Sequence, residues 1–216
     1  MQQPQQPSST KQQARSNAVR ATSRSAAPRA HAVRIIGGRW KRTPIRIADL
    51  AGLRPTPDRV RETVFNWLAH LRPDLDRLRG LDLFAGSGAI GFELASRGAA
   101  AVTLVERNPR ALQALEALRA RLHAEEITIL AGDAFAHASM LPRGGFDIVF
   151  LDPPYGEGLL AAALPVVRPL LAAEALVYVE DNAPLDEPTL HSAGFRIVRH
   201  DRAGQVNFAL LSEAGD

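Results

Sequence analysis

The chain has 216 residues, of which 46% are hydrophobic and 23% charged, a composition typical of one globular domain with a substantial core. It has no cysteine, which excludes disulfides and thiolate metal sites, and we expect no bound metal. No apolar run approaches the roughly 18 residues that a membrane span needs, so we expect a cytoplasmic protein without a membrane segment.

The first 48 residues are strongly basic. They contain ten of the 26 Lys and Arg residues and none of the 23 Asp and Glu residues, whereas the whole chain has a net charge of only +3. A basic arm on a mildly acidic body suits a polyanionic partner, because phosphate neutralisation dominates binding to nucleic acid. A solvated tail that keeps the protein soluble is the alternative.

Within this arm, residues 1–31 are rich in Gln, Ser, Ala and Arg and have almost no large apolar side chains. Such a segment cannot bury enough surface to offset its ordering entropy, so we expect a disordered basic tail. Its composition is also compatible with an organellar transit peptide.

Residues 32–50 differ from this tail. The pieces Val33–Ile36 and Thr43–Ile47 predict two short strands, which a Gly-Gly-Arg-Trp-Lys-Arg turn joins into a basic β-hairpin. Cations beside an indole can pair with phosphates and stack on a base, although packing of Trp40 on the body fits the pattern equally well. The candidate RNA-binding residues are Arg34, Arg39, Trp40, Lys41, Arg42 and Arg46.

A helix is predicted next. Thr56 can cap its first turn, where Pro57 fits without losing a hydrogen bond and Asp58 complements the helix dipole. The apolar residues at helical spacing, which should face the core, are Val60, Val64, Trp67, Leu68 and Leu71. The residues that fall largely outside this stripe are Arg59, Arg61, Glu62 and Asn66.

From Leu81 onward the chain alternates strands and helices. The predicted strands are Leu81–Phe84, Ala101–Glu106, Ile127–Ala131, Phe146–Leu151, Ala175–Glu180, Phe195–His200 and Gln205–Leu211. Helix-length segments separate the first five, which predicts βαβ units and a parallel sheet covered on both faces. The last two are joined by only Asp201–Gly204 and should form an antiparallel hairpin. The sequence therefore predicts a doubly wound, Rossmann-like α/β fold, whose ligand lies at the carboxyl ends of the strands.

A glycine-rich loop follows the first of these strands. Gly86, Gly88 and Gly91 match the G-x-G-x-x-G pattern, which lets the backbone approach a nucleotide cofactor closely. The carboxylate of Asp82 would repel a pyrophosphate, whereas it would attract the ammonium and sulfonium groups of S-adenosylmethionine. The loop therefore favours S-adenosylmethionine over a nicotinamide dinucleotide, with a purely structural turn as the alternative.

Two further strand ends carry acids. Glu106, about 20 residues past the glycines, is placed to accept both ribose hydroxyls, and Asp133 could accept from the adenine amino group. Each has a structural alternative as an acid at a helix N-terminus. Together with Asp82, they occur in the order that one nucleoside requires.

The fourth strand end, Asp152-Pro153-Pro154-Tyr155, is the most informative. Its prolines hold the backbone extended and remove two N–H donors. The Asp152 carboxylate and the Pro153 carbonyl can then accept both hydrogens of a planar amino group, while Tyr155 stacks on the base. Because this aims the nitrogen lone pair at a methyl donor, catalysis would rest mainly on orientation, with Asp152 or solvent taking the proton.

These motifs resemble those of known enzymes. Asp152 to Tyr155 is similar to the (D/N/S)-P-P-(Y/F/W) motif of amino-group methyltransferases, and Asp82 to Gly88 is similar to their D-x-F-x-G-x-G loop. Over residues 33–211 the chain resembles the RsmD family, which methylates N2 of one guanine in bacterial 16S rRNA. The segments that carry this resemblance are Arg34–Gly38, Arg54–Glu62 (the most specific), Phe65–Leu68 and Ala203–Val206.

The resemblance implies a methyltransferase domain over residues 51–216, with S-adenosylmethionine as its cofactor. The implied cofactor site consists of Asp82, Phe84, Ala85, Gly86, Ser87, Gly88, Glu106, Asp133, Ala134, Thr56 and Arg59. The implied catalytic residues, which hold the guanine, are Asp152, Pro153, Pro154 and Tyr155. The resemblance also implies that the segment from Pro55 to Glu62 closes over the pocket and that the hairpin contacts RNA. The expected partner is 16S rRNA or the assembling small ribosomal subunit, and we expect a monomer.

Many family members have Phe at the position of Tyr155, which preserves stacking, and residues 1–31 have no counterpart in the family. Three other functions fit parts of the sequence. A methyltransferase acting on adenine N6 or cytosine N4 of DNA or another RNA shares both motifs, but DNA enzymes usually carry a further target-recognition region. A non-catalytic RNA-binding assembly factor would not need intact motifs, and a dehydrogenase explains neither Asp82 nor the segment from Asp152.

Overall fold

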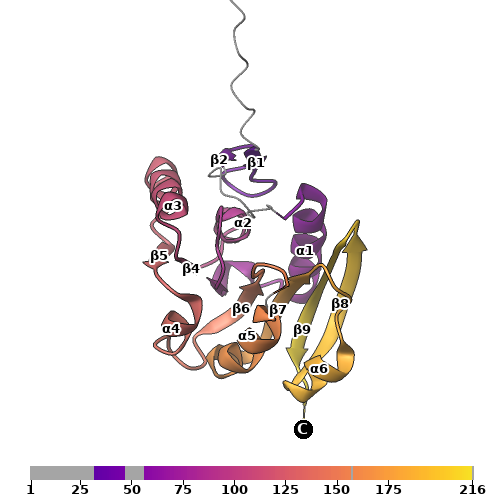
Figure 1. Ribbon diagram of the computed structural model, residues 1–216. Coiled ribbons are helices and arrows are strands. Elements are labelled where there is room, and N and C mark those ends of the chain that lie inside the picture. Colours follow the sequence, from indigo (N-terminus) through magenta and orange to yellow (C-terminus); the bar gives the residue numbers. More distant parts are fainter. Residues whose placement is uncertain (1–31, 47–55, 157, 216) are drawn as a thin grey trace, which may run out of the picture.

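The computed structural model describes residues 32–46, 56–156 and 158–215, so the predicted tail over residues 1–31 lies outside the described residues. A small sheet pairs strands β1 (Ala32–Arg34) and β2 (Pro44–Arg46), and a seven-stranded sheet occupies the centre (Figure 1). The strands of the central sheet are β3 (Arg79–Asp82), β4 (Ala101–Glu106), β5 (Ile127–Ala131), β6 (Phe146–Leu151), β7 (Leu171–Asp181), β8 (Phe195–Ala203) and β9 (Val206–Glu213).

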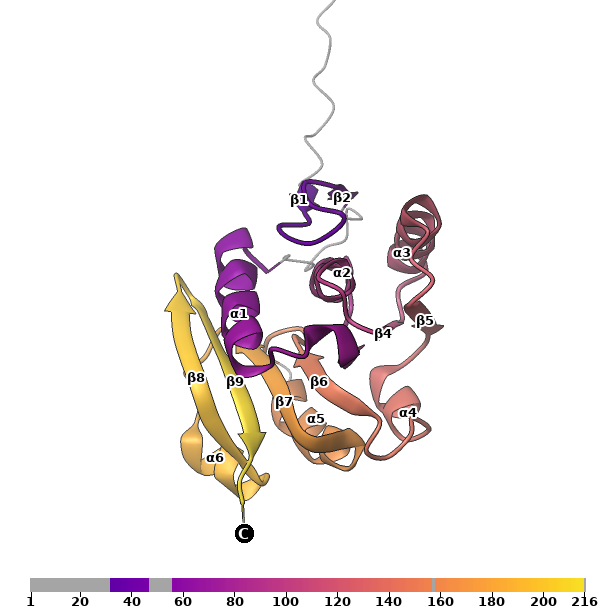
Figure 2. The same cartoon turned by 180° about the vertical axis from the view of Figure 1, so that it is seen from behind.

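Helices cover both faces of this sheet (Figure 2). They are α1 (Asp58–Leu71), α2 (Ala89–Ser96), α3 (Pro109–Leu122), α4 (Ala134–Ala138), α5 (Leu159–Val167) and α6 (Glu187–Ser192), with short 3-10 turns at Leu75–Arg77 and Arg168–Leu170. One hydrophobic cluster joins the hairpin, α1, α2 and α3 to one face, and a second joins α4, α5 and α6 to the other. The predicted two-layered covering of the sheet is therefore confirmed. No helix in the described part of the chain is both long enough and apolar enough to cross a bilayer.

The strand order is β5-β4-β3-β6-β7-β9-β8. Strands β3 to β7 run parallel, and β9 enters antiparallel between β7 and β8. This confirms the doubly wound fold and the antiparallel C-terminal hairpin, whose turn contains Gly204 at φ +68°. The chain order reverses between β3 and β6, which is where such folds bind ligands.

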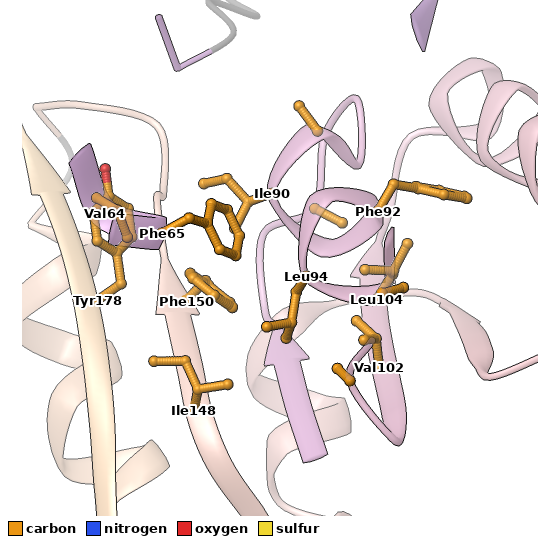
Figure 3. Packing of buried hydrophobic residues seen from close by; sticks show 14 of the residues in the cluster. Val64, Phe65, Ile90, Phe92, Leu94, Val102, Leu104, Ile148, Phe150 and Tyr178 are labelled. Atoms are coloured by element: carbon orange, nitrogen blue, oxygen red, sulfur yellow. The ribbon is translucent and has the colours of Figure 1, made fainter. Parts of the chain in front are cut away.

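Strand β3 begins and ends two residues earlier than the predicted Leu81–Phe84. The prediction omitted Arg79 and Gly80 because neither residue type favours strands. Gly80 is needed there because a Cβ atom would lie 2.3 Å from Cδ2 of Leu94, the α2 residue that packs on this strand. Figure 3 shows Leu94 above β3, between Ile148 on β6 and Val102 on β4.

Helix α1 confirms most of the predicted apolar stripe, since Val60, Val64 and Leu68 are buried. Two details of the prediction were wrong. The helix begins after Pro57, with no side-chain cap, so Thr56 does not cap it. Arg61 was placed outside the stripe, yet only 1% of its surface is exposed, because a carboxylate from α2 lies beside it.

That carboxylate belongs to Glu93, which fixes the N-terminal hairpin on the body. Its two oxygens accept from the backbone N–H groups of Ile36 (2.6 Å) and Gly37 (2.8 Å), and it pairs with Arg61 at 3.6 Å and with Arg97 at 2.7 Å. The N–H groups of the hairpin at its junction with α2 therefore have partners on a rigid helix, and the hairpin is part of the folded body.

The turn of the hairpin lies against the end of the same helix. Gly38 has φ +73°, and a Cβ atom there would lie 1.8 Å from the Ser96 carbonyl oxygen. The backbone N–H of Trp40 donates to the Ser96 hydroxyl at 2.9 Å, and that hydroxyl donates to the Gly37 carbonyl at 2.7 Å. The predicted hairpin is thus confirmed over residues 32–46, while Ile47 lies outside the described residues.

Candidate active site at the carboxyl ends of the parallel strands

A cavity of about 260 Å³ opens at the carboxyl ends of β3, β4, β5 and β6. The acids predicted at the four strand ends, Asp82, Glu106, Asp133 and Asp152, all line this cavity. Parallel strands end at the same edge of a sheet, so positions separated by up to 70 residues converge there.

Asp82 ends β3 with only 3% of its surface exposed. Burial first, and then the charge of the nearby Glu106, raise its pKa to about 7, against the opposing effect of the backbone N–H groups of Gly91 and Phe84. A buried carboxyl in this state is stabilised by any cation that enters the cavity. The position therefore fits a positively charged ligand.

The glycine loop connects Asp82 to α2. Gly86 has φ +52°, and its N–H donates to Oε2 of Glu106 at 2.7 Å, which holds the loop against β4. Gly88 begins α2 in a left-handed conformation, and a Cβ atom there would lie 2.4 Å from Cδ2 of Leu115. The first of these glycines lines the cavity, and the second serves the packing of α2 on α3.

Glu106 and Asp133 have local partners besides their place in the cavity. Oε1 of Glu106 accepts from the N–H of Asn108 at 2.6 Å. Asp133 caps α4, where its Oδ1 accepts from the N–H of Ala136 at 2.9 Å. Asp133 therefore caps a helix, as its structural alternative predicted, and it also lines the cavity. Each carboxylate oxygen has two lone pairs, so both acids can still accept from a ligand.

Asp152, Pro153, Pro154 and Tyr155 all line the cavity beyond the end of β6. Oδ2 of Asp152 accepts a 3.1 Å hydrogen bond from the hydroxyl of Thr56, which is itself a buried residue of the cavity wall. Burial, followed by the charge of Glu180, raises the pKa of Asp152 well above its ordinary value, whereas the Thr56 hydroxyl lowers it. The raised pKa makes the Asp152 carboxylate a stronger base, and it lies beside the planar ring of Tyr155.

Glu180, at the end of β7, is a functional candidate that the sequence reading missed. Only 2% of its surface is exposed. Its Oε1 accepts from the Tyr155 hydroxyl and its Oε2 from the Tyr178 hydroxyl, each at 2.7 Å. The signal was a pair of acids, Glu180 and Asp181, closing an apolar strand whose carboxyl end lies beside that of β6.

The remaining predicted cofactor residues divide into two groups. Phe84, Ala85, Ser87 and Ala134 line the cavity, as does Thr56. Arg59 is exposed on the first turn of α1, and neither Arg59 nor Gly88 belongs to the cavity wall. Within the described part of the segment from Pro55 to Glu62, Thr56 is the residue that reaches the cavity.

The predicted RNA-binding residues lie on the hairpin, away from the cavity lining. Arg34, Arg39, Lys41, Arg42 and Arg46 are exposed. The guanidinium of Arg39 lies 4.2 Å from the centre of the Trp40 ring and forms an ion pair with Glu126.

Trp40 itself faces the body. Its ring centre lies 6.3 Å from that of Phe92 on α2, and it packs against the core as a partly buried residue. Most of the Trp40 side chain therefore packs on the body, which is one of the two alternatives that the sequence left open. The exposed part of its ring lies under the Arg39 guanidinium.

Comparison with known proteins gives three kinds of match. A family model described as "Conserved hypothetical protein 95" matches residues 33–212. Ribosomal RNA small subunit methyltransferase D of Escherichia coli K12 is 42% identical over 182 residues, covering 82% of this chain and 88% of that protein. The protein of the same name from Haemophilus influenzae is 35% identical, with 82% and 92% covered. The solved structure of the yhhF protein of Escherichia coli superposes with a TM-score of 0.72 at 38% identity, covering 86% of this chain and 99% of that one.

Proposed function

The chain belongs to the RsmD-like family of small-subunit rRNA methyltransferases, matched here by the Conserved hypothetical protein 95 model, and from this membership we propose a specific reaction. The protein transfers a methyl group from S-adenosylmethionine to the exocyclic N2 of guanine 966 in 16S rRNA. The observation that carries the proposal is the shared cavity, in which Asp152 and Tyr155 face the same space as Asp82 and Glu106.

The residues of the cavity fit S-adenosylmethionine. Among the described residues, four carboxyl groups and one basic residue, Arg107, line it, a charge distribution that suits a cationic ligand and disfavours a pyrophosphate. Glu106 at the end of β4 can accept from ribose hydroxyls. Phe84 and Phe135, with ring centres 6.2 Å apart, supply apolar surface for a purine.

When bound, S-adenosylmethionine supplies an electrophilic methyl group on a sulfonium that becomes a neutral thioether. Asp82 and Glu106 would bind and orient it through charge and hydrogen bonds. The sheet holds these acids in place through the ladders that pair β3 with β4 and with β6. Preorganised acceptors of this kind contribute by positioning the reacting groups.

Asp152 and its neighbours act on the guanine. The Asp152 carboxylate and the Pro153 carbonyl accept from the two hydrogens of N2, which aims the nitrogen lone pair at the methyl group. As the N–C bond forms, N2 becomes positively charged and must lose a proton. The raised pKa of Asp152 suits it to take that proton. Tyr155 stacks on the base and excludes water from one side.

The hairpin supplies the RNA contact. Lys41 and Arg42 are exposed cations at its turn, beside Arg39. Exposed cations on a rigid element bind the phosphate backbone without reading bases, whereas the pocket reads the base itself. We propose that the substrate is 16S rRNA or the assembling small subunit and that the enzyme acts in the cytoplasm as a monomer. Gel filtration would check the oligomeric state.

The decisive experiment uses labelled S-adenosylmethionine and small ribosomal subunits from cells that lack the endogenous activity, followed by nucleoside analysis. We expect label in N2-methylguanosine, and none with the Asp152→Ala variant although that variant still binds the cofactor. Label in N6-methyladenosine or N4-methylcytidine would contradict the proposed target. Turnover by Asp152→Ala would contradict the role given to the carboxylate.

A further inference from the structure

The reaction described above assigns no step to Glu180. This buried carboxylate on β7 nevertheless occupies the position beside the end of β6, where Asp152 lies. Leu151 of β6 pairs with Val179 of β7 in the parallel ladder. The next residue on each strand is therefore Asp152 on one and Glu180 on the other. Two carboxylates on neighbouring strands at this edge are costly unless each has hydrogen-bond partners.

The partners of Glu180 are two tyrosine hydroxyls from different parts of the fold. Tyr178 lies two residues earlier on the same strand, so its side chain emerges on the same face. Tyr155 belongs to the loop after β6, in which Gly156 has φ +84° and Gly158 has φ +65°. Glu180 thus joins a loop residue to a strand residue through two hydrogen bonds of 2.7 Å.

The strand side of this linkage is rigid. Tyr178 has 1% of its surface exposed, and its ring centre lies 5.9 Å from that of Phe150, which in turn lies 6.2 Å from that of Phe65 on α1. Figure 3 shows these three rings next to one another, with the Tyr178 hydroxyl pointing toward the end of the sheet where the parallel strand arrows point. The hydroxyl and the Glu180 carboxylate are therefore held by the core.

The loop side carries the ring that lines the cavity. Tyr155 is half-buried, and among the described residues its hydroxyl has one hydrogen-bond partner, Glu180. We propose that Glu180 is a positioning residue, whose carboxylate fixes the Tyr155 ring through its hydroxyl and so sets the plane on which the guanine stacks beside Asp152. This inference rests on the proposed function, since it assigns a role within that active site.

A second effect follows from the same placement. The groups that act on Asp152 from the surrounding elements are Glu180 and Asp181 on β7, Asp82 on β3 and the Thr56 hydroxyl before α1. All three acids raise the pKa of Asp152, and Glu180 is the strongest of them. Neutralising Glu180 should therefore lower the pKa of Asp152, which a purely structural role would not do.

The test compares Tyr155→Phe, Glu180→Gln and the double variant with wild type, using methyl transfer to N2 of guanine in small subunits over a range of pH. Glu187→Gln is the matched control, because Glu187 is exposed on α6. We expect Tyr155→Phe to lower kcat by about tenfold without changing cofactor affinity, because the stacking plane is no longer fixed. Glu180→Gln should lower kcat less, since its amide oxygen can still accept from the Tyr155 hydroxyl. The double variant should have the same maximal kcat as Tyr155→Phe, since both changes act on one hydrogen bond and coupled residues are not additive.

The pH profile separates the two roles. In Glu180→Gln the acidic limb should move to lower pH, whereas in Tyr155→Phe it should stay in place. Multiplicative losses in the double variant, or wild-type kcat in Tyr155→Phe, would overturn the proposal. If Glu180→Gln does not fold, Tyr155→Phe alone decides by its kcat. Failure of wild type to methylate guanine would instead count against the proposed function.

Discussion

The hydroxyl of Thr56 donates a 3.1 Å hydrogen bond to Oδ2 of Asp152, joining a residue two positions before α1 to the loop after β6 across 96 positions of sequence. Both residues line the cavity. Thr56 was predicted as a helix cap and as a cofactor ligand. Its observed partner is the carboxyl that we propose to be catalytic, so the segment with the most specific resemblance to the family contacts that carboxyl directly.

Replacing Thr56 by Val should move the acidic limb of the pH–kcat profile to higher pH. The hydroxyl stabilises the charged form of Asp152, so its removal raises the pKa of that carboxyl further. This shift is in the direction opposite to that expected for Glu180→Gln. Thr56→Ser, which keeps the hydroxyl, should behave like wild type, and an unshifted limb in Thr56→Val would contradict this role.

Affinity for S-adenosylmethionine should fall as the pH drops below about 7. Burial first, and then the charge of Glu106, raise the pKa of Asp82 to about 7. A cationic ligand binds the ionised form, so below this pKa binding requires loss of a proton and weakens by up to about tenfold per unit. Isothermal titration at several pH values would measure this. Asp82→Asn should flatten the dependence, and 5′-methylthioadenosine, which lacks the charged groups, should show none.

The triple replacement of Arg39, Lys41 and Arg42 by Ala should weaken RNA binding and reduce its salt dependence. Each lost phosphate contact lowers the slope of log affinity against log salt by about 0.7 to 0.9. Filter binding at several salt concentrations would measure the slope. Arg143→Ala removes an exposed cation just before β6, at the opposite end of the sheet, and should leave the slope unchanged. An unchanged slope in the triple variant would mean that RNA binds elsewhere.

Glu93→Gln should destabilise the fold and weaken RNA binding together. The Glu93 and Arg61 side chains are both fully buried, and Glu93 holds two N–H groups of the hairpin. Removing one member of such a buried pair costs about 3 kcal/mol, which urea denaturation would detect. Glu116→Gln breaks an exposed pair with Arg119 and should cost less than about 1 kcal/mol. A loss of stability with intact RNA binding would show that the hairpin stays in place without Glu93.

The sequence predicted the elements of the fold and the convergence of the four acids. Both follow from local pattern and one general rule, that parallel strands present their carboxyl ends on one edge. Asp82 and Asp152 could be brought together on this basis without coordinates. The boundaries of β3 were less predictable, because Gly80 is explained by a leucine of another element.

The buried charges could not be predicted in the same way. Arg61 was predicted to lie outside the buried stripe of α1. A helical periodicity treats every cation as polar, whichever residue of another element packs against it. Its partner Glu93 comes from α2, and Glu180 depends on Tyr155 in a separate loop. Burial of a charge is decided by pairing between distant segments, and a periodicity confined to one segment contains no information about it.

Helix α2 has a consequence for how the enzyme selects its target. Its first residues, Ala89 and Ile90, line the cavity, while Glu93 and Ser96 hold the hairpin. Eight helical residues span only about 12 Å, and they form one rigid unit with the sheet. In the proposed function, the cations that bind phosphate and the methyl-transfer site would therefore lie at a fixed separation. The enzyme would choose among guanines by geometry, since only a base displaced from the contacted backbone by that separation would reach Asp152.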